Sequence, residues 1–280
     1  MAADHKAVLG RPETDRFCHV IPVSGVVPRF KRVVKKMVSV AVEIALNPSG
    51  LVRFVRDRRN FRRSGGLVTN FWPILRDFHD KAGTARGHYF HQDLLVASFI
   101  FERSPKRHID IGSRIDGFVA HVAAFREIEI VDVRPVESSQ HHQISFLQRD
   151  MMVEDAQNSD VADSISCLHA IEHFGLGRYG EPLDAEGHIR GFLNIVKMLK
   201  VGGYFYLSFP IGITNEVHFN AHRVFHPTDV LSWPGSAGVL ELERFDYVDD
   251  AGDLHLEADL STSVPVLRYG CGIYTFRKVA

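Results

Sequence analysis

The sequence contains few cysteines and no long apolar run. Its 280 residues include three cysteines, Cys18, Cys167 and Cys271, whose odd number and wide spacing argue against a disulfide framework. This usage favours a reducing compartment, so we expect a cytoplasmic protein. No run approaches the roughly 18 apolar residues of a membrane-spanning helix. Residues 1–10 also lack the apolar core of a signal peptide.

Charge is unevenly distributed along the chain, although the formal net charge is only −1. Residues 1–87 carry 17 Lys and Arg against 7 Asp and Glu, a balance of +10. Residues 88–280 carry 16 against 27, a balance of −11. This asymmetry predicts a basic, helical N-terminal extension over residues 1–87 and a separate domain over residues 88–280.

The extension contains two basic segments. Apolar residues recur at helical spacing along residues 29–46, which predicts a helix, and residues 51–63 carry six arginines. The intervening Asn-Pro-Ser-Gly, residues 47–50, is expected to end the first helix. Such bases can contact an anionic membrane or pack on the acidic domain. Aromatic residues do not alternate with the bases as a nucleic-acid stacking platform requires, so we expect no nucleic-acid partner.

The acidic domain contains short apolar runs separated by segments of helical length. Three runs, residues 108–112, 128–132 and 164–173, end in acidic, glycine or histidine residues, and a fourth covers residues 204–210. Such runs are typical of buried strands in a parallel sheet, which binds ligands at the carboxyl ends of its strands. We also predict helices over residues 91–102, 118–125 and 184–198, and final strands over residues 239–248 and 272–279.

The order and spacing of these motifs resemble the class I S-adenosylmethionine-dependent methyltransferases. The first strand of that family ends in an acidic residue and a glycine-rich turn, matched here by Asp110, Gly112 and Gly117. Its second strand ends in the carboxylate that binds the ribose diol, matched by Asp132, which follows 22 residues later (132 − 110). The resemblance implies an α/β, doubly wound Rossmann-like fold. Its seven-stranded sheet would end in an antiparallel hairpin, and the cofactor would be S-adenosylmethionine.

Further motifs extend the resemblance over residues 90–280. Asp150 follows the third strand, where an Asp often faces the adenine amino group, and residues 199–203 resemble the Leu-Lys-Pro-Gly-Gly turn before the fifth strand. The fourth strand of the family commonly closes in a Glu-His pair, matched by Glu172 and His173. The cofactor contacts implied by the resemblance are Asp110, Gly112, Ser113, Arg114, Gly117, Asp132, Asp150 and His169.

The glycine-rich loop departs from the pattern of the family. It reads Asp-Ile-Gly-Ser-Arg-Ile-Asp-Gly, one residue longer than usual, and Arg114 stands in place of the second glycine. Glycine is used there because the backbone turns with φ > 0 and approaches the ligand closely. Arg114 could therefore fill the methionine pocket, or it could pair with the carboxylate of the cofactor.

His169, Glu172 and His173 spell His-x-x-Glu-His, which on a helix is a zinc-peptidase pattern. Here the pattern follows an apolar strand, and no third ligand follows in a helical frame, so we expect no metal site. In the methyltransferase interpretation Glu172 and His173 close the floor of the active site, and His173 can act as general base. The alternative is a histidine that only bonds to neighbouring loops.

His218, His222 and His226 recur every four residues and would share one face of a helix. Pro227 disfavours helical geometry at His226, so a metal-binding helix is not expected. We predict instead a loop over the substrate pocket, with His222 and Arg223 in contact with the acceptor.

These motifs predict methyl transfer to an oxygen or nitrogen acceptor, with His173, Glu172 and His222 as catalytic residues. Residues 87–94 and 219–224 also resemble an uncharacterised methyltransferase-like family found among bacterial surface-polysaccharide genes, which implies a saccharide acceptor and a role in polysaccharide biosynthesis. The alternative is a non-catalytic Rossmann-like module that recruits partners to a membrane-associated assembly at the inner membrane face. Arg114 favours this alternative, whereas Asp132 and the Glu172-His173 pair favour an enzyme.

Overall fold

The protein is represented by a computed structural model that describes residues 47–136, 140–155 and 158–280. The chain divides into two compact units, Met1–Gly83 and Thr84–Ala280. The helix expected over residues 29–46 lies outside the described residues, and so does Cys18. No helix in the described ranges combines the length and the apolar composition needed to cross a membrane.

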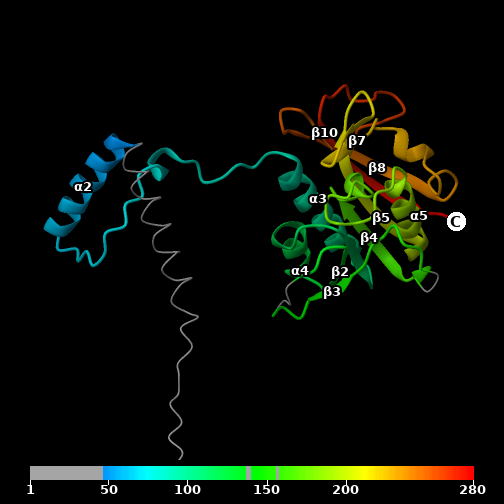
Figure 1. Ribbon diagram of the computed structural model, residues 1–280, viewed down its shortest axis with the longest axis horizontal. Helices are drawn as coiled ribbons and strands as arrows, with labels where there is room; N and C mark the ends of the chain where they lie inside the picture. Colours follow the sequence, from blue (N-terminus) through cyan, green and yellow to red (C-terminus); the bar gives the residue numbers. More distant parts are fainter. Residues whose placement is uncertain (1–46, 137–139, 156–157) are drawn as a thin grey trace, which may run out of the picture. The chain divides into compact units, whose positions relative to one another are not determined.

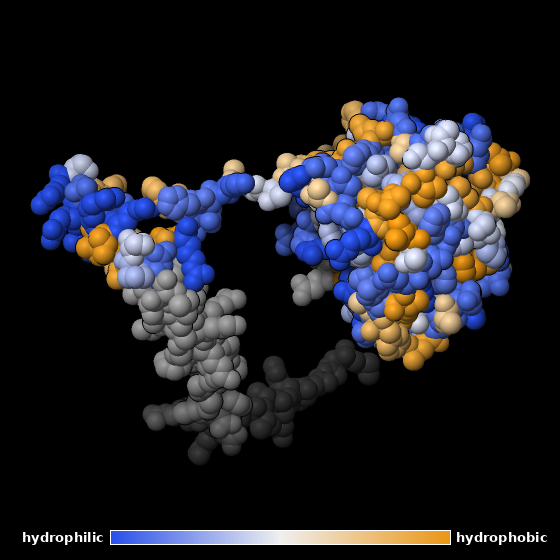
Figure 2. All heavy atoms as spheres, turned by 90° about the horizontal axis from the view of Figure 1, so that it is seen from above, coloured by the Kyte–Doolittle hydropathy of each residue, from blue (hydrophilic) through white to orange (hydrophobic). Residues whose placement is uncertain are grey.

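The first unit contains the basic helix α2 (Pro48–Arg63) and the short 3-10 helix η2 (Asp77–His79). Asn47 caps α2 because its side-chain oxygen accepts a hydrogen bond from the Gly50 amide at 2.9 Å, and Pro48 stands in the first turn. Residues 47–50 therefore begin a helix, a role that the sequence analysis did not assign to them. No side chain of α2 is buried, and Figure 2 shows this segment as mostly hydrophilic.

An eight-stranded sheet forms the centre of the second unit (Figure 1). Its order is β3-β2-β1-β4-β5-β10-β8-β9; the first five strands are parallel, and β10 runs antiparallel to both β5 and β8. The strands are β1 (His108–Ile111), β2 (Ile128–Asp132), β3 (Ile144–Gln148), β4 (Ala162–Leu168), β5 (Leu199–Ile211), β8 (Leu240–Val248), β9 (Leu254–His255) and β10 (Gly270–Lys278). The predicted fold is confirmed, and the two-residue β9 is an eighth strand beyond the expected seven.

Helices cover both faces of this sheet (Figure 1). They are α3 (His88–Arg103), the π-helix η3 (Ile115–Val119), α4 (Ala120–Ala123), the 3-10 helices η5 (Ile171–His173) and η6 (Asp229–Ser232), and α5 (Gly187–Met198). One core cluster joins α3, η3 and α4 to the sheet, with Ile100 and Phe118 beside Ile130. The other contains Phe192 of α5 and Phe205 of β5. Burial on both faces explains why the strands read as continuous apolar runs.

The chain order creates a crevice beside β1. From β1 the chain passes outward through β2 and β3, then crosses back to β4 on the other side of β1. Both β2 and β4 pair with β1 in parallel. The segment after β1 therefore leads to one side of this strand, and the segment after β4 leads to the other side, toward β5. In open α/β sheets ligands bind at this topological switch point, outside the carboxyl ends of the strands.

Candidate active site

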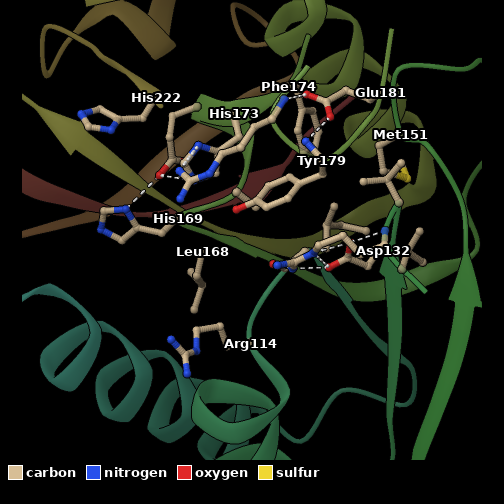
Figure 3. A pocket seen from close by; sticks show the side chains of 18 of the residues that line it. Arg114, Asp132, Met151, Leu168, His169, His173, Phe174, Tyr179, Glu181 and His222 are labelled. Carbon is tan, nitrogen blue, oxygen red and sulfur yellow. Dashed lines mark hydrogen bonds and ion pairs between the residues drawn. The ribbon is translucent and has the colours of Figure 1, made fainter. Parts of the chain in front are cut away.

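A cavity of about 610 Å³ lies at this edge of the sheet (Figure 3). Its walls come from the ends of β1, β2 and β4 and from the segments that follow β1, β2, β3 and β4. The start of α3, the first residue of β7 and the residue preceding β10 complete them. Of the residues predicted from the sequence, those that line it are Gly112, Arg114, Asp132, Asp150, His169, Glu172, His173 and His222. Asp110, Ser113 and Gly117 do not line it.

The loop after β1 is organised by the buried carboxylate of Asp110. This group accepts hydrogen bonds from the Ser113 amide (3.1 Å), the Ser113 hydroxyl (2.8 Å) and the Ser166 hydroxyl (2.5 Å). Burial raises the pKa of Asp110 to about 7, against the lowering effect of the serine hydrogen bonds. Asp110 and Ser113 therefore fix the conformation of the loop without lining the cavity.

The irregular glycine loop is explained by its backbone angles. Gly112 makes the turn with φ = +75°, and a Cβ there would lie 2.8 Å from the Cβ of Ala170. Arg114 has φ = −74°, so glycine is not required at its position. At Gly117 a Cβ would lie 3.0 Å from Asp93 Oδ2, so its small size serves packing against α3.

The side chain of Arg114 lines the cavity but is largely exposed. It forms an ion pair with Asp116, with Nη2 2.8 Å from Oδ2, and the two side chains are 68% and 73% exposed. Its guanidinium is therefore exposed enough to turn toward an anionic group in the cavity. Both sequence-based hypotheses, filling the methionine pocket and pairing with the cofactor carboxylate, remain predictions.

Asp132 ends β2 and is already paired. The guanidinium of Arg134 contacts both oxygens of this carboxylate, and its Nη2 also donates to the Gly112 carbonyl at 3.1 Å. The same guanidinium lies 4.7 Å from the centre of the Tyr179 ring. Arg134 thus connects the ends of β1 and β2, and the sequence analysis did not single it out.

Asp150 follows β3 and binds the backbone. Its Oδ1 accepts a hydrogen bond from the Met152 amide at 2.8 Å, and Met151 and Met152 line the cavity beside it. Met151 is buried in the core. This side of the cavity thus combines thioether side chains with a carboxylate.

His169, Glu172 and His173 all line the cavity. Figure 3 shows His169 on the opposite side of it from Asp132. His169 adopts φ = +49° directly after β4, and its Nδ1 lies 2.9 Å from Glu172 Oε1. Burial acts to lower the pKa of His169, but Cys271 and Glu172 together raise it well above its usual value. Glu172 is fully buried, so it orients histidines and does not reach a substrate freely.

His173 is held in one tautomer. Its Nδ1–H donates to the carbonyl of Ala221 at 2.6 Å, which leaves Nε2 as the acceptor, 3.7 Å from Glu172 Oε1. Burial lowers the pKa of His173, so the neutral ring that can accept a proton is favoured.

His222 stands on a hairpin rather than on the predicted loop. Strands β6 (Glu216–His218) and β7 (His222–Val224) are antiparallel, and His218 pairs directly with His222, with ring centres 4.9 Å apart. The four-residue spacing therefore reflects a cross-strand pair. His222 lines the cavity, whereas Arg223 is buried and donates to the carbonyls of Phe174 (2.7 Å) and Ala185 (3.1 Å). The prediction that Arg223 contacts the acceptor is wrong for this reason.

One group of possible metal ligands occurs among the described residues. The ligand atoms of His88, His169 and Cys271 all lie within 4.8 Å of one another. Neither the His-x-x-Glu-His pattern nor the three histidines of residues 218–226 form such a group within the described part of the chain.

Comparison with protein families gives one match. Residues 120–231, less than half of the chain, match the family described as Caenorhabditis protein of unknown function, DUF268. No curated protein matches the sequence.

Three solved structures illustrate the structural similarity. The 1,6-didemethyltoxoflavin-N1-methyltransferase of Burkholderia thailandensis, bound to 1,6-didemethyltoxoflavin and S-adenosylhomocysteine, is 12% identical, with a TM-score of 0.46 over 68% of this chain and 79% of that one. The N-methyltransferase NodS of Bradyrhizobium japonicum WM9 is 15% identical, with a TM-score of 0.43 over 75% and 93%. A TehB-like methyltransferase of Corynebacterium glutamicum is 16% identical, with a TM-score of 0.45 over 83% and 100%. Such similarity assigns no reaction to this chain.

Proposed function

We propose that the protein is an S-adenosylmethionine-dependent methyltransferase that acts on an oxygen or nitrogen acceptor. One observation carries the proposal: a carboxylate at the end of β2, Asp132, and a neutral histidine, His173, line the same cavity at the switch point of the sheet. The first suits a ribose diol, and the second suits removal of a proton from an acceptor.

The residues around the cavity fit this cofactor on one condition. Val131 and Leu168 give apolar walls, and Gly112 lets the loop approach its neighbours closely. Asp132 can accept ribose hydroxyls only if Arg134 releases at least one of its oxygens. The Arg134 side chain is 37% exposed, so it can turn toward solvent.

Each contact in the proposal has a definite role. Asp132 would hold the ribose, Asp150 would face the adenine, and Arg114 would pair with the methionine carboxylate near Gly112. S-adenosylmethionine, when bound, supplies a methyl group whose bond to sulfur breaks as the acceptor attacks, with the electron pair remaining on sulfur. The protein mainly aligns the two reactants.

His173 is the proposed general base. Its Nδ1–H is fixed on the Ala221 carbonyl, so Nε2 is free to take the proton that the acceptor loses. Glu172 keeps the histidines oriented, and His222 reaches the same cavity from the β6–β7 hairpin. The charged and aromatic lining suits a polar small molecule, and we propose a saccharide hydroxyl as acceptor.

A second candidate is a non-catalytic Rossmann-like module that recruits partners to a membrane-associated assembly. The observation that favours it is the pairing of Asp132 with Arg134, which satisfies the ribose carboxylate without any ligand. In both candidates we propose that residues 1–87 act as a basic extension of the domain over residues 88–280. The extension would contact anionic lipid at the cytoplasmic face of the membrane.

Isothermal titration calorimetry with S-adenosylhomocysteine tests the enzyme proposal. We expect saturable binding of one molecule per chain to the full-length protein. Absence of both heat and a thermal shift at millimolar ligand would exclude the enzyme and favour the non-catalytic module.

A further inference from the structure

We propose that His88, His169 and Cys271 form a zinc-binding site beside the cavity, on the side lined by His169 and His173. The three side chains come from the first turn of α3, the residue after β4 and the second residue of β10. Their ligand atoms lie within 4.8 Å of one another. Two imidazoles and one thiolate are ligands that zinc prefers, and small side-chain rotations bring such atoms to bonding distance.

The orientation of His169 supports this site. Its Nδ1 bonds to Glu172 Oε1 at 2.9 Å, which directs Nε2 toward the cluster. This Nε2 is fully buried and has no hydrogen-bond partner among the described residues. Metal-binding histidines commonly use the second nitrogen to bond a carboxylate, because that contact fixes the ring and makes it more basic. A bound cation would also satisfy a buried atom that is otherwise costly to leave without a partner.

The other two ligands are held in position by the fold. The Gly87 amide donates to the Gly252 carbonyl at 2.9 Å, and Arg86 pairs with Asp253, so the start of α3 is fixed beside the turn after β8. His88 stacks on His169, with ring centres 5.3 Å apart. Cys271 is fully buried, and its sulfur contacts Gln92 Oε1 at 3.7 Å and the Gly272 carbonyl at 3.6 Å. It also lies close enough to His169 to act on the pKa of that ring.

The site is of the open, three-ligand kind. His88 and His169 line the cavity, so the fourth position of a tetrahedral ion would face it. Structural zinc sites use four protein ligands, whereas sites with three leave one position for water or substrate. This inference rests on the proposed function, because it assigns the acceptor: a hydroxyl that binds the cation. Such binding favours loss of the acceptor proton, which His173 on the same side of the cavity would take.

Metal binding is measured directly on full-length protein freed of metal with a chelator. Titration with Zn²⁺ should reach one ion per chain. Titration with Co²⁺ should give a thiolate-to-cobalt charge-transfer band. Cys271→Ser should remove this band and weaken Zn²⁺ binding at least a hundredfold. Glu172→Gln should weaken it about tenfold to a hundredfold, as for other residues that orient ligands.

Cys167→Ser is the matched control, since Cys167 is a second buried thiol of the same sheet, on β4, and lies outside the cluster. It should retain the band. If Cys271→Ser fails to fold, His88→Gln replaces it, because His88 lines the cavity, and this variant should also weaken Zn²⁺ binding. A band that persists in Cys271→Ser, or wild-type protein that takes up no metal, would overturn the site.

The same titrations separate this inference from the proposed function. Binding of S-adenosylhomocysteine to metal-free protein without any Zn²⁺ uptake would reject the metal site alone. Zn²⁺ uptake in protein that does not bind S-adenosylhomocysteine would support the site and reject methyl transfer.

Discussion

The guanidinium of Arg134 caps the carboxylate of Asp132 at the end of β2. Its Nε lies 2.9 and 3.1 Å from the two oxygens, its Nη2 lies 2.5 Å from Oδ2, and the Arg134 amide donates to Oδ1 at 2.8 Å. The Asp132 side chain is only 6% exposed. A nucleoside that uses this carboxylate must therefore compete with a side chain two residues away.

Removing this competitor should improve cofactor binding. We expect Arg134→Ala to bind S-adenosylhomocysteine about tenfold more tightly, because the ligand no longer has to displace Arg134 from the Asp132 carboxylate. Asp132→Ala should weaken binding by about 1.5–3 kcal/mol, the range for a hydrogen bond to a charged group. Calorimetry measures both effects.

A matched control for this pair lies on β8. Arg244 and Asp246 form the same kind of pair two residues apart and do not line the cavity, so Arg244→Ala should leave affinity unchanged. If Arg134→Ala instead abolishes binding, Arg134 is a ligand contact and not a competitor.

Arg114 provides a second test in the same cavity. If it pairs with the methionine carboxylate, Arg114→Gly should weaken S-adenosylhomocysteine binding by about 1.5–3 kcal/mol, whereas adenosine, which lacks that carboxylate, should bind equally well to both proteins. Asp116→Asn releases Arg114 from its present partner and should modestly strengthen binding. Tighter binding by Arg114→Gly would mean that the side chain obstructs the cavity.

The buried carboxyl of Asp110 should make stability depend on pH. Burial raises its pKa from 3.8 to about 7 in the folded protein, so the folded state holds this proton more tightly than the unfolded state. The stabilisation that this protonated group adds to the free energy of unfolding is complete below about pH 4 and is lost as the pH rises through about 7. Asp110→Asn, which cannot ionise, should gain about 2–4 kcal/mol relative to wild type between pH 4 and pH 8.

Chemical denaturation across this pH range measures that difference. Asp116→Asn changes an exposed carboxylate of the same loop and should give a nearly constant difference. A flat profile for Asp110→Asn would show that the group keeps an ordinary pKa in the fold.

The arginines of α2 should determine any attraction to lipid. Replacing Arg59, Arg62 and Arg63 by Gln should weaken binding to anionic vesicles at low salt by about 3 kcal/mol, roughly 1 kcal/mol per base. The corresponding Lys variant keeps the charge and should bind like wild type, and salt should reduce both. Equal co-sedimentation of the Gln variant and wild type would rule out the membrane role of this helix.

Much of the fold could be predicted from the sequence because its signals are local. A strand buried on both faces must be apolar throughout, and this property marked β1, β2, β4 and β5. The expected strands over residues 239–248 and 272–279 differ from β8 and β10 by no more than two residues at either end. The hairpin of residues 216–224 was predicted as a loop, because Pro227 argued against a helix and strands of three residues are too short to show an alternating pattern.

The site was only partly predictable, since several of its residues come together through the fold alone. Ligand atoms of residues 88, 169 and 271 converge although the residues are 81 and 102 positions apart (169 − 88 and 271 − 169), and no motif links them. Arg134 stands two residues after Asp132, so an Asp-x-Arg pattern at a strand end was an available signal. The catalytic and cofactor roles assigned to individual residues remain predictions.

The buried Arg223 links several parts of the site mechanically. From β7 its guanidinium reaches carbonyls on both sides of the segment between η5 and α5, at residues 172, 174 and 185. The β6–β7 hairpin therefore cannot move outward as an independent lid without breaking the hydrogen bonds that Arg223 donates to these carbonyls. If the cavity binds the proposed acceptor, the hairpin that carries His222 would meet it as a preformed wall and not as a closing lid.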